Sequence, residues 1–162
     1  MRTETITSAQ NSKIKMLLAL GEKSRTRREN SLFVVEGRKE IGHCLDAGYK
    51  VRTLFACPEI IPERELEKIA ERCGEDCTIV NVPAHLYEKI AYRGSTEGVI
   101  AEAEIIDKSL GDIKLRENPL VIVLESVEKP GNLGAVLRTA DAADADAVIV
   151  CDPLTDLYNP NL

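Results

Sequence analysis

The sequence predicts an α/β protein made of two units. Apolar segments of strand length alternate with helical segments over residues 1–105, which is typical of a sheet covered by helices. A polar stretch at 106–118 interrupts this alternation, and a second strand–helix–strand pattern follows it. We therefore expect a first domain at residues 1–105, a linker at 106–118 and a second unit at 119–162.

The first predicted element is a helical region over residues 8–31. Ser8 or Asn11 can cap its start, since both side chains accept hydrogen bonds from backbone N–H groups. Gly21 is expected to interrupt it before the basic run KSRTRREN. A stripe at helical spacing predicts its buried face: Ile14, Leu17, Leu18 and Gly21.

The rest of the first unit alternates between strand and helix. Pro62 opens one helix and Gly74 follows its end, which is the usual asymmetry of helix termini. The predicted segments are strand 32–37, helix 38–48, strand 51–57, helix 62–74, strand 78–82, helix 83–91 and strand 97–105.

The second unit begins with LVIVL, which is apolar on both faces and suits a parallel strand covered on both sides. A helix over 132–145 and a strand over 146–151 follow; the helix's buried stripe is Leu133, Val136, Leu137 and Ala140. The carboxyl end of the first strand meets the amino end of the helix, where ligands and negative charge are commonly held. Asn132 and Gly134 would allow a tight turn and a close approach there. The dinucleotide fingerprint is absent, which disfavours a nicotinamide-binding protein.

Charge is distributed unevenly along the chain. Residues 1–40 hold nine Lys or Arg and five Glu, a net charge of +4, whereas the whole chain carries −6 and the remainder therefore −10. A basic start on an acidic body can attract a phosphate backbone locally, although a solvated helix face is an equal alternative. With no long apolar run and no signal peptide, we expect a cytoplasmic protein that does not enter membranes.

The cysteines do not form a disulfide or metal framework. Their number is odd, and the pair in CGEDC lacks a second pair of Cys or His ligands, so reduced thiols are the better interpretation. The five are Cys44, Cys57, Cys73, Cys77 and Cys151.

Motifs in both units, in the same order, resemble the SpoU-type (TrmH-like) RNA ribose methyltransferases of the trefoil-knot (SPOUT) superfamily. NLGAVLRTADA is similar to the family's first motif, and DPLTDLYNPNL to its next segment. SAQNSKIKMLLAL, FVVEGRKEI and STEGVIAEAE resemble the family's amino-terminal substrate-binding domain. The residues matching around the first motif are Glu125, Pro130, Asn132, Gly134 and Arg138.

The resemblance implies an L30e-like α/β/α sandwich followed by the first βαβ portion of a SPOUT (α/β-knot) methyltransferase domain. It also implies methyl transfer from S-adenosylmethionine to a ribose 2′-hydroxyl of ribosomal or transfer RNA, by a homodimer that needs no metal. The alternative is a stand-alone L30e-type RNA-binding module without catalysis. An open reading frame continuing with Gly-x-Glu and Ser-Leu-Asn segments would favour the enzyme.

By resemblance, Arg138 lies near the reacting hydroxyl and Asn132 shapes the site. Arginine is a poor base because its pKa exceeds about 12. We therefore expect Arg138 to form a fork onto an adjacent RNA phosphate, which also lowers the pKa of the hydroxyl. Two alternatives stay open: Arg138 pairs with Asp141 three residues later, and Asn132 caps its helix.

The other matching residues are given structural or RNA-binding roles. Glu125 is expected to hold the turn by accepting backbone N–H groups, and Pro130 and Gly134 to shape it. Glu36 and Gly37 either shape a loop near the RNA or only end their strand. The expected phosphate contacts are Lys23, Arg25, Arg27 and Arg28, with Lys13, Lys15 and Arg38 as further candidates.

The family's glycine-rich and Ser-Leu-Asn motifs, which build most of the cofactor pocket, do not occur in this sequence. We therefore expect the cofactor-binding residues to lie beyond Leu162, and this chain to be a shortened form or degradation product that neither binds cofactor nor turns over. Two parallel strands and one helix cannot cover their own apolar faces. The second unit should then pair with a second copy or be poorly ordered.

Overall fold

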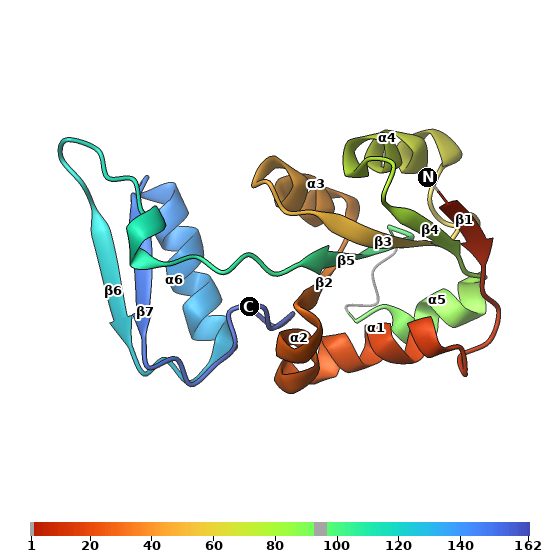
Figure 1. Ribbon diagram of the computed structural model, residues 1–162, viewed down its shortest axis with the longest axis horizontal. Coiled ribbons are helices and arrows are strands. Elements are labelled where there is room, and N and C mark those ends of the chain that lie inside the picture. Colours follow the sequence, from red (N-terminus) through yellow and green to blue (C-terminus); the bar gives the residue numbers. More distant parts are fainter. Residues whose placement is uncertain (1, 93–96) are drawn as a thin grey trace. The chain divides into compact units, whose positions relative to one another are not determined.

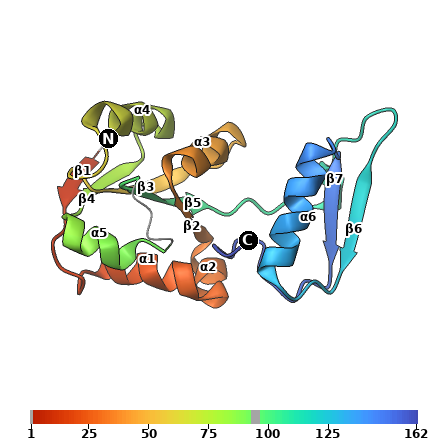
Figure 2. The ribbon, with the colours of Figure 1, turned by 180° about the vertical axis from the view of Figure 1, so that it is seen from behind.

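The structure is a computed structural model that describes residues 2–92 and 97–162 (Figures 1 and 2). Ser95 and Thr96, which begin the STEGVIAEAE motif, lie outside the described residues. The chain divides into two compact units, one up to Ile105 and one from Ile106 onward. No helix in the described ranges is both long and apolar enough to cross a lipid bilayer.

The first unit is built on a five-stranded mixed sheet. Its strands lie in the order β1-β4-β3-β5-β2. β1, β4 and β3 run parallel, and β5 is antiparallel to both β3 and β2. Their bounds are β1 (Arg2–Thr5), β2 (Leu32–Glu36), β3 (Val51–Ala56), β4 (Thr78–Asn81) and β5 (Val99–Glu104).

Helices cover both faces of this sheet (Figure 1). α1 (Ser12–Glu22) and α5 (Ala84–Ile90) pack on one face, and α3 (Arg38–Asp46) and α4 (Glu63–Cys73) on the other. Alternating side chains on each strand feed the two cores: Leu54 packs toward α3 and α4, and Phe55 toward α1 and α5. The predicted α/β/α sandwich is confirmed.

The amino-terminal helical region differs from the prediction. It is two helices, α1 and α2 (Ser24–Asn30), which break at Lys23. Asn11 is the N-cap, and its Oδ1 accepts a hydrogen bond from the Lys13 N–H at 2.9 Å. Leu20 is buried in place of Leu18, which is 36% exposed. The buried face of α1 repeats every three residues, from Ile14 to Leu17 to Leu20, which is close to one helical turn.

The second unit is a βαβ crossover. β6 (Val121–Glu125) and β7 (Ala147–Cys151) pair in parallel, and α6 (Pro130–Ala142) connects them. Leu133 and Ala140 of the predicted stripe are buried, whereas Val136 and Leu137 are half-buried. Val123 on β6 is 62% exposed, so the expected covering of both strand faces is absent within the described residues.

The predicted linker is tied to the second unit. It contains the short 3₁₀ helix η1 (Leu110–Asp112), and the Arg116 guanidinium Nε donates to Asp146 Oδ1 at 2.7 Å. Asp146 also accepts the Leu120 N–H at 2.8 Å. These bonds hold the start of β6 to the start of β7.

Candidate functional site

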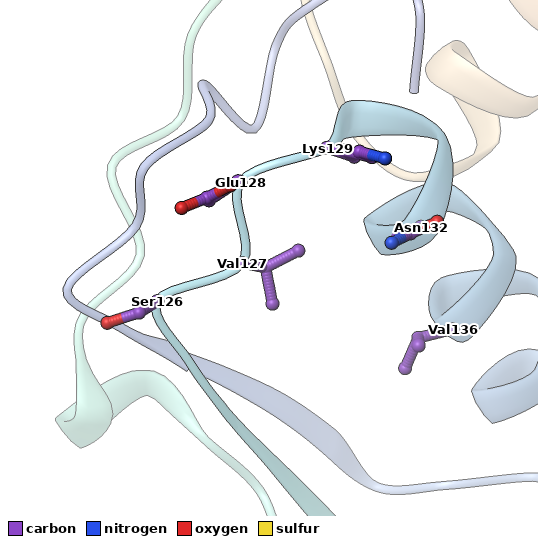
Figure 3. Close-up of a pocket in the computed structure, with 6 residues that line it drawn as sticks. All are labelled: Ser126, Val127, Glu128, Lys129, Asn132 and Val136. Carbon is purple, nitrogen blue, oxygen red and sulfur yellow. The ribbon is translucent and has the colours of Figure 1, made fainter.

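A hollow of about 360 Å³ lies where β6 ends and α6 begins (Figure 3). β6 ends at Glu125, and Ser126 then takes a left-handed backbone conformation with φ of 53°, which turns the chain toward the helix. The hollow is lined by Ser126, Val127, Glu128, Lys129, Asn132 and Val136. All six come from the β6–α6 loop and the first two turns of α6.

Asn132 does not cap α6. The helix begins two residues earlier than predicted, because Pro130 has the backbone angle that suits a first helical position. Lys129 is the N-cap, and no described side chain caps the helix. The Asn132 side chain therefore lies inside the first turn, beside the hollow (Figure 3), and makes no hydrogen bond to the described residues.

The start of α6 offers fewer donors to a negative charge than the sequence suggested. Pro130 has no N–H, and the N–H groups of Asn132 and Leu133 donate to the Lys129 carbonyl at 3.0 and 3.2 Å. Of residues 130–133, Gly131 is the one whose N–H group can face a ligand. A ligand here would therefore rely on side chains more than on the helix end.

Gly134 is a point of close approach. A Cβ placed on it would lie 2.6 Å from the backbone carbonyl carbon of Leu162 and 3.2 Å from Arg138 Nη1. Residues 156–162 are shaped by two Asx-type turns, in which Asp156 accepts the Tyr158 N–H and Asn159 the Asn161 N–H, each at 3.0 Å. Glycine lets this segment lie directly on α6.

The Arg138 guanidinium is directed along α6 toward its amino end, as its position beside Gly134 shows. Its side chain is exposed and forms no ion pair within residues 2–92 and 97–162. The alternative that Asp141 neutralises Arg138 is therefore wrong for this structure. Arg138, Gly134 and the segment ending at Leu162 lie together, and Asn132 lies on the first turn of the same helix.

Glu125 does not have its expected role. It is exposed at the end of β6, and no described backbone N–H donates to its carboxylate. The left-handed conformation of Ser126 makes the turn instead, while the Ser126 N–H continues the sheet by donating to the Cys151 carbonyl at 3.0 Å.

The basic residues of the first unit differ in their freedom to bind a phosphate. Lys15, Lys23 and Arg28 are exposed and form no ion pair with the described residues. Lys13 pairs with Glu4. Arg25 pairs with Glu29 at 2.6 Å, but its side chain is 84% exposed, and such surface pairs exchange readily.

The prediction that Arg27 contacts a phosphate is wrong for this structure. It is 2% exposed, and its Nη1 donates to the Leu20 carbonyl at 2.6 Å and to the Gly21 carbonyl at 3.2 Å. These carbonyls lie in the last turn of α1, where no further helical N–H can reach them. A guanidinium held this way cannot reach a phosphate outside.

Glu36 and Gly37 organise a loop at the other end of β2. Glu36 Oε2 accepts the Tyr92 N–H at 2.7 Å, and Gly37 has a φ of 107° that favours glycine. Glu97 accepts the Arg38 N–H at the start of α3, where a negative charge is favourable. The five residues of β2 separate this loop from α2 by about 17 Å, so the predicted contacts form two groups.

Several residues of the site were missed by the sequence analysis. Ser126, Val127, Glu128 and Lys129 line the hollow, and their position directly after an apolar strand was the signal that could have identified them. The Arg116–Asp146 contact had no signal, because thirty residues separate the partners. In the described ranges, no group of three or more His, Cys, Asp or Glu is arranged to hold a metal ion.

Comparison with known proteins gives consistent family matches along the chain. Residues 11–101 match the MRM3-like substrate binding domain, and residues 119–162 match the SpoU rRNA methylase family. The 23S rRNA (uridine(2479)-2'-O)-methyltransferase of Streptomyces viridochromogenes is 31% identical over 144 residues, which are 87% of this chain and 48% of that protein. The 23S rRNA (guanosine(2553)-2'-O)-methyltransferase of Bacillus subtilis is 27% identical, covering 95% of this chain and 57% of that protein.

Solved structures agree with these matches. The crystal structure of an rRNA methyltransferase from Sinorhizobium meliloti superposes with a TM-score of 0.85 at 29% identity, covering 98% of this chain and 58% of that one. An AdoMet-bound structure from the same organism also superposes with a TM-score of 0.85, at 28% identity. The chain spans about half the length of the curated relatives it matches. The chain therefore belongs to the SpoU rRNA methylase family and carries that family's MRM3-like substrate-binding domain at residues 11–101.

Proposed function

We propose that the protein containing this chain transfers a methyl group from S-adenosylmethionine to a ribose 2′-hydroxyl of RNA, with ribosomal RNA as the favoured substrate. The relatives named above are 23S rRNA 2'-O-methyltransferases, and they match both units. The observation that carries the proposal is the Arg138 guanidinium, which pairs with none of the described acids and is directed along α6 toward its amino end, where Asn132 lines an open hollow.

The described residues fit part of a cofactor site. The hollow is near the lower end of ordinary ligand pockets, which are about 300–1,000 Å³. Val127 and Val136 give it apolar surface, and Asn132 offers both an amide donor and an acceptor. Bound S-adenosylmethionine would supply the activated methyl group. The fit is therefore to one wall of such a site, formed by the β6–α6 loop.

Arg138 acts on the substrate in this proposal. A neutral ribose hydroxyl is a weak nucleophile and must lose its proton as the methyl group moves. Arg138 stays protonated, so it is not the base. Instead, its planar fork holds an RNA phosphate and places the neighbouring hydroxyl in line with the reacting carbon. The nearby positive charge also stabilises the developing oxyanion.

In this proposal, the first unit binds the RNA backbone. The cations Lys15, Lys23, Arg25 and Arg28 are exposed along α1 and α2 and are proposed to contact phosphates. Lys13 and Arg38 are secondary contacts, because Glu4 and Glu97 accompany them. Glu36 and Gly37 are proposed to shape the loop beside the RNA.

The remaining features of the proposal concern partners and place. The leaving group is a neutral thioether, so the reaction requires no metal. Exposed apolar side chains on the second unit, Val123 and Leu154 at 62% each, support a homodimer. We place the reaction in the cytoplasm, where ribosomal RNA is matured, and propose no membrane partner.

The test uses the full-length gene product that contains these 162 residues. It is incubated with methyl-labelled S-adenosylmethionine and ribosomal RNA from a strain lacking the gene. The expected product is labelled RNA in which one phosphodiester resists alkaline hydrolysis, because a methylated 2′-oxygen cannot attack it. Binding of RNA with no label transferred would support the stand-alone RNA-binding module instead.

Arg138→Lys tests the fork. We expect kcat/KM to fall at least tenfold, or about 1.4 kcal/mol, because an ammonium cannot make two parallel bonds to a phosphate. Arg64→Lys is the matched control, since Arg64 is an exposed arginine on α4. An Arg138→Lys enzyme with the wild-type rate would contradict the forked contact.

A further inference from the structure

One aromatic side chain of the first unit is open to solvent. The chain holds four tyrosines and two phenylalanines, all of them among the described residues. Tyr92 is 51% exposed, whereas Phe55 and Tyr87 are buried and the other three are half-buried. Among these six rings, Tyr92 is therefore the one that an outside molecule can cover.

The backbone of Tyr92 is held in place although its ring is exposed. Tyr92 lies two residues beyond the end of α5, and the Ala91 N–H closes that helix by donating to the Tyr87 carbonyl at 2.9 Å. The Tyr92 N–H donates to Glu36 Oε2, at the end of β2, at 2.7 Å. A hydrogen bond to a carboxylate is stronger than one between neutral groups. The held backbone lowers the entropy cost of binding a ligand at this ring.

Two basic side chains belong to the same loop. Arg38 follows Glu36 by two residues, so at most about 7 Å of backbone separates them. The Arg38 N–H donates to the Glu97 carboxylate, and Arg38 Nε lies 3.8 Å from Glu97 Oε2. Lys39 is exposed and forms no ion pair with the described residues. The loop therefore combines one open ring with positive charge.

Tyr92 follows a helix that lies beside the basic region of the first unit. α5 packs with α1 on one face of the sheet, and the two helices lie side by side in both views (Figures 1 and 2). The length of β2, about 17 Å, separates α2 from the loop and corresponds to about five nucleotides at ~3.4 Å each. An RNA strand of about ten nucleotides is therefore long enough to reach both places.

Stacking is the interaction that an exposed tyrosine ring offers to RNA. Every base has a flat face, which an aromatic side chain covers when the base is splayed out of a helix. Bases within a duplex cover one another, so a duplex leaves the ring without a partner. The ring therefore favours an unpaired nucleotide.

We propose that Tyr92 is a stacking platform for an unpaired base of the RNA substrate, and that Glu36 positions this platform through the Tyr92 N–H. The inference rests on the proposed function, since it takes RNA as the ligand, and it adds that the RNA is single-stranded where it meets the first unit. Three observations support it: the exposure of the ring, its held backbone and the position of α5 beside α1.

The test uses the 162-residue chain and a ribo-oligonucleotide of about ten cytidines and uridines, either single-stranded or annealed to its complement. We expect the single strand to bind more tightly than the duplex. With 5-iodouridine in the strand, irradiation should join the RNA to the peptide that contains Tyr92, because this crosslink forms where a base lies against a ring. Equal binding of the duplex, no binding of the single strand or crosslinks that all lie elsewhere would overturn the proposal.

Variants separate stacking from charge. Tyr92→Ala should weaken binding of the single strand about 5- to 150-fold, the usual effect of losing one stacked base, and leave the salt slope unchanged because no phosphate contact is lost. Tyr92→Phe keeps a flat ring and should bind as wild type does. Leu115→Ala, which removes a 55% exposed apolar side chain from the other unit, is the matched control and should change nothing. Wild-type affinity in Tyr92→Ala would overturn the proposal.

The positioning role of Glu36 is tested by rescue. Glu36→Ala should weaken binding as Tyr92→Ala does, whereas Glu36→Gln keeps an oxygen that accepts the Tyr92 N–H and should restore most of the affinity. Glu36→Ala with wild-type affinity would contradict this role. Self-association that Tyr92→Ala abolishes while RNA binding stays unchanged would overturn the proposal and assign the ring to a contact between copies. These measurements use no S-adenosylmethionine, so their failure is distinct from a failure of methyl transfer.

Discussion

Arg27 and Arg28 are neighbours in the basic run, yet their side chains have opposite surroundings. Arg27 is buried and bonds the terminal carbonyls of α1, whereas Arg28 is exposed. The break at Lys23 explains the difference, because it leaves α1 with carbonyls that no helical N–H reaches, directly beside α2. A buried guanidinium costs less when carbonyls bind it, so Arg27 stabilises the junction while the Arg28 side chain stays in contact with solvent.

Glu102 is the other buried charged residue in the part of the chain that the structure describes, and its ionisation should limit stability. It is 7% exposed on β5, and burial raises the pKa of its carboxyl group, while a hydrogen bond from Thr53 partly opposes this. Its Oε1 has no hydrogen-bond partner among the described residues. The folded protein therefore holds the proton more tightly than the unfolded chain does.

The stability of the protein should consequently fall as pH rises from about 4.3, the usual Glu value, through the raised pKa of Glu102. Glu102→Gln removes the charge and this fall, so the variant should be more stable above that range by about 1–3 kcal/mol, the usual cost of an unsatisfied buried polar atom. Urea denaturation at pH 4 and pH 8 measures the difference.

The control for this prediction is Glu71→Gln, since Glu71 is exposed on α4. It should change stability little at either pH. A Glu102→Gln variant that is less stable than wild type at pH 8 would show that the carboxylate makes a favourable contact when ionised.

At the scale of elements, β1 shows why an edge strand can escape notice. Its residues, RTET, are polar and largely exposed. β1 pairs with β4 through its backbone, in the register Arg2 with Thr78, and this pairing does not depend on apolar side chains. Short polar strands are common at sheet edges, where they discourage association with another chain.

The contact between Arg116 and Asp146 holds a segment and a strand together and should be sensitive to acid. Only 3% of the Asp146 side chain is exposed, and the Arg116 side chain holds the pKa of this carboxyl group far below its usual range. Asp146 then contributes stability above about pH 4, where the unfolded carboxyl is ionised, and loses it as the pH falls.

Asp146→Asn should therefore loosen β6 and β7 most at neutral pH, and the gap from wild type should shrink in acid. Hydrogen exchange of the amides in residues 121–125 and 147–151 reports this. Asp144→Asn is the matched control: Asp144 also pairs with Arg116, but its side chain is 86% exposed and should matter little. Equal effects of both variants would contradict the special role of Asp146.

At the scale of the whole molecule, the uneven distribution of charge along the chain leads to a prediction about RNA binding. Replacing both Lys23 and Arg28 with Ala should weaken RNA binding and reduce the salt dependence by about 0.7–0.9 in the log–log slope for each phosphate that is no longer neutralised. Filter binding of ribosomal RNA across a salt series measures both quantities. Arg64→Ala with Lys68→Ala removes the same charge from α4, on the other face of the sheet, and should change neither.

If the α4 control weakens RNA binding as much as the α1–α2 variant, the attraction is a property of net charge and no specific face is used. If neither variant changes the slope, the phosphate contacts lie elsewhere on the protein.

The order of strands and helices could be predicted from local patterns, because strand alternation and helical spacing are written in neighbouring residues. The same holds for the family motif around Arg138, whereas the start of α6 at Pro130 was placed two residues too late. Local pattern also pointed to the junction of β6 and α6, where the structure has the hollow. These features depend on a few consecutive residues and on the backbone they favour.

The partners of individual side chains were decided only by the tertiary structure. The burial of Arg27, the exposure of Arg138 away from every described acid and the clasp of Arg116 on Asp146 each depend on which chain segment lies opposite. The sequence shows the same residue type whether an arginine bonds the carbonyls at a helix end, pairs with a carboxylate or is exposed without an ion pair. Its role follows from the partners and the exposure that packing gives it, and packing is a property of the whole fold.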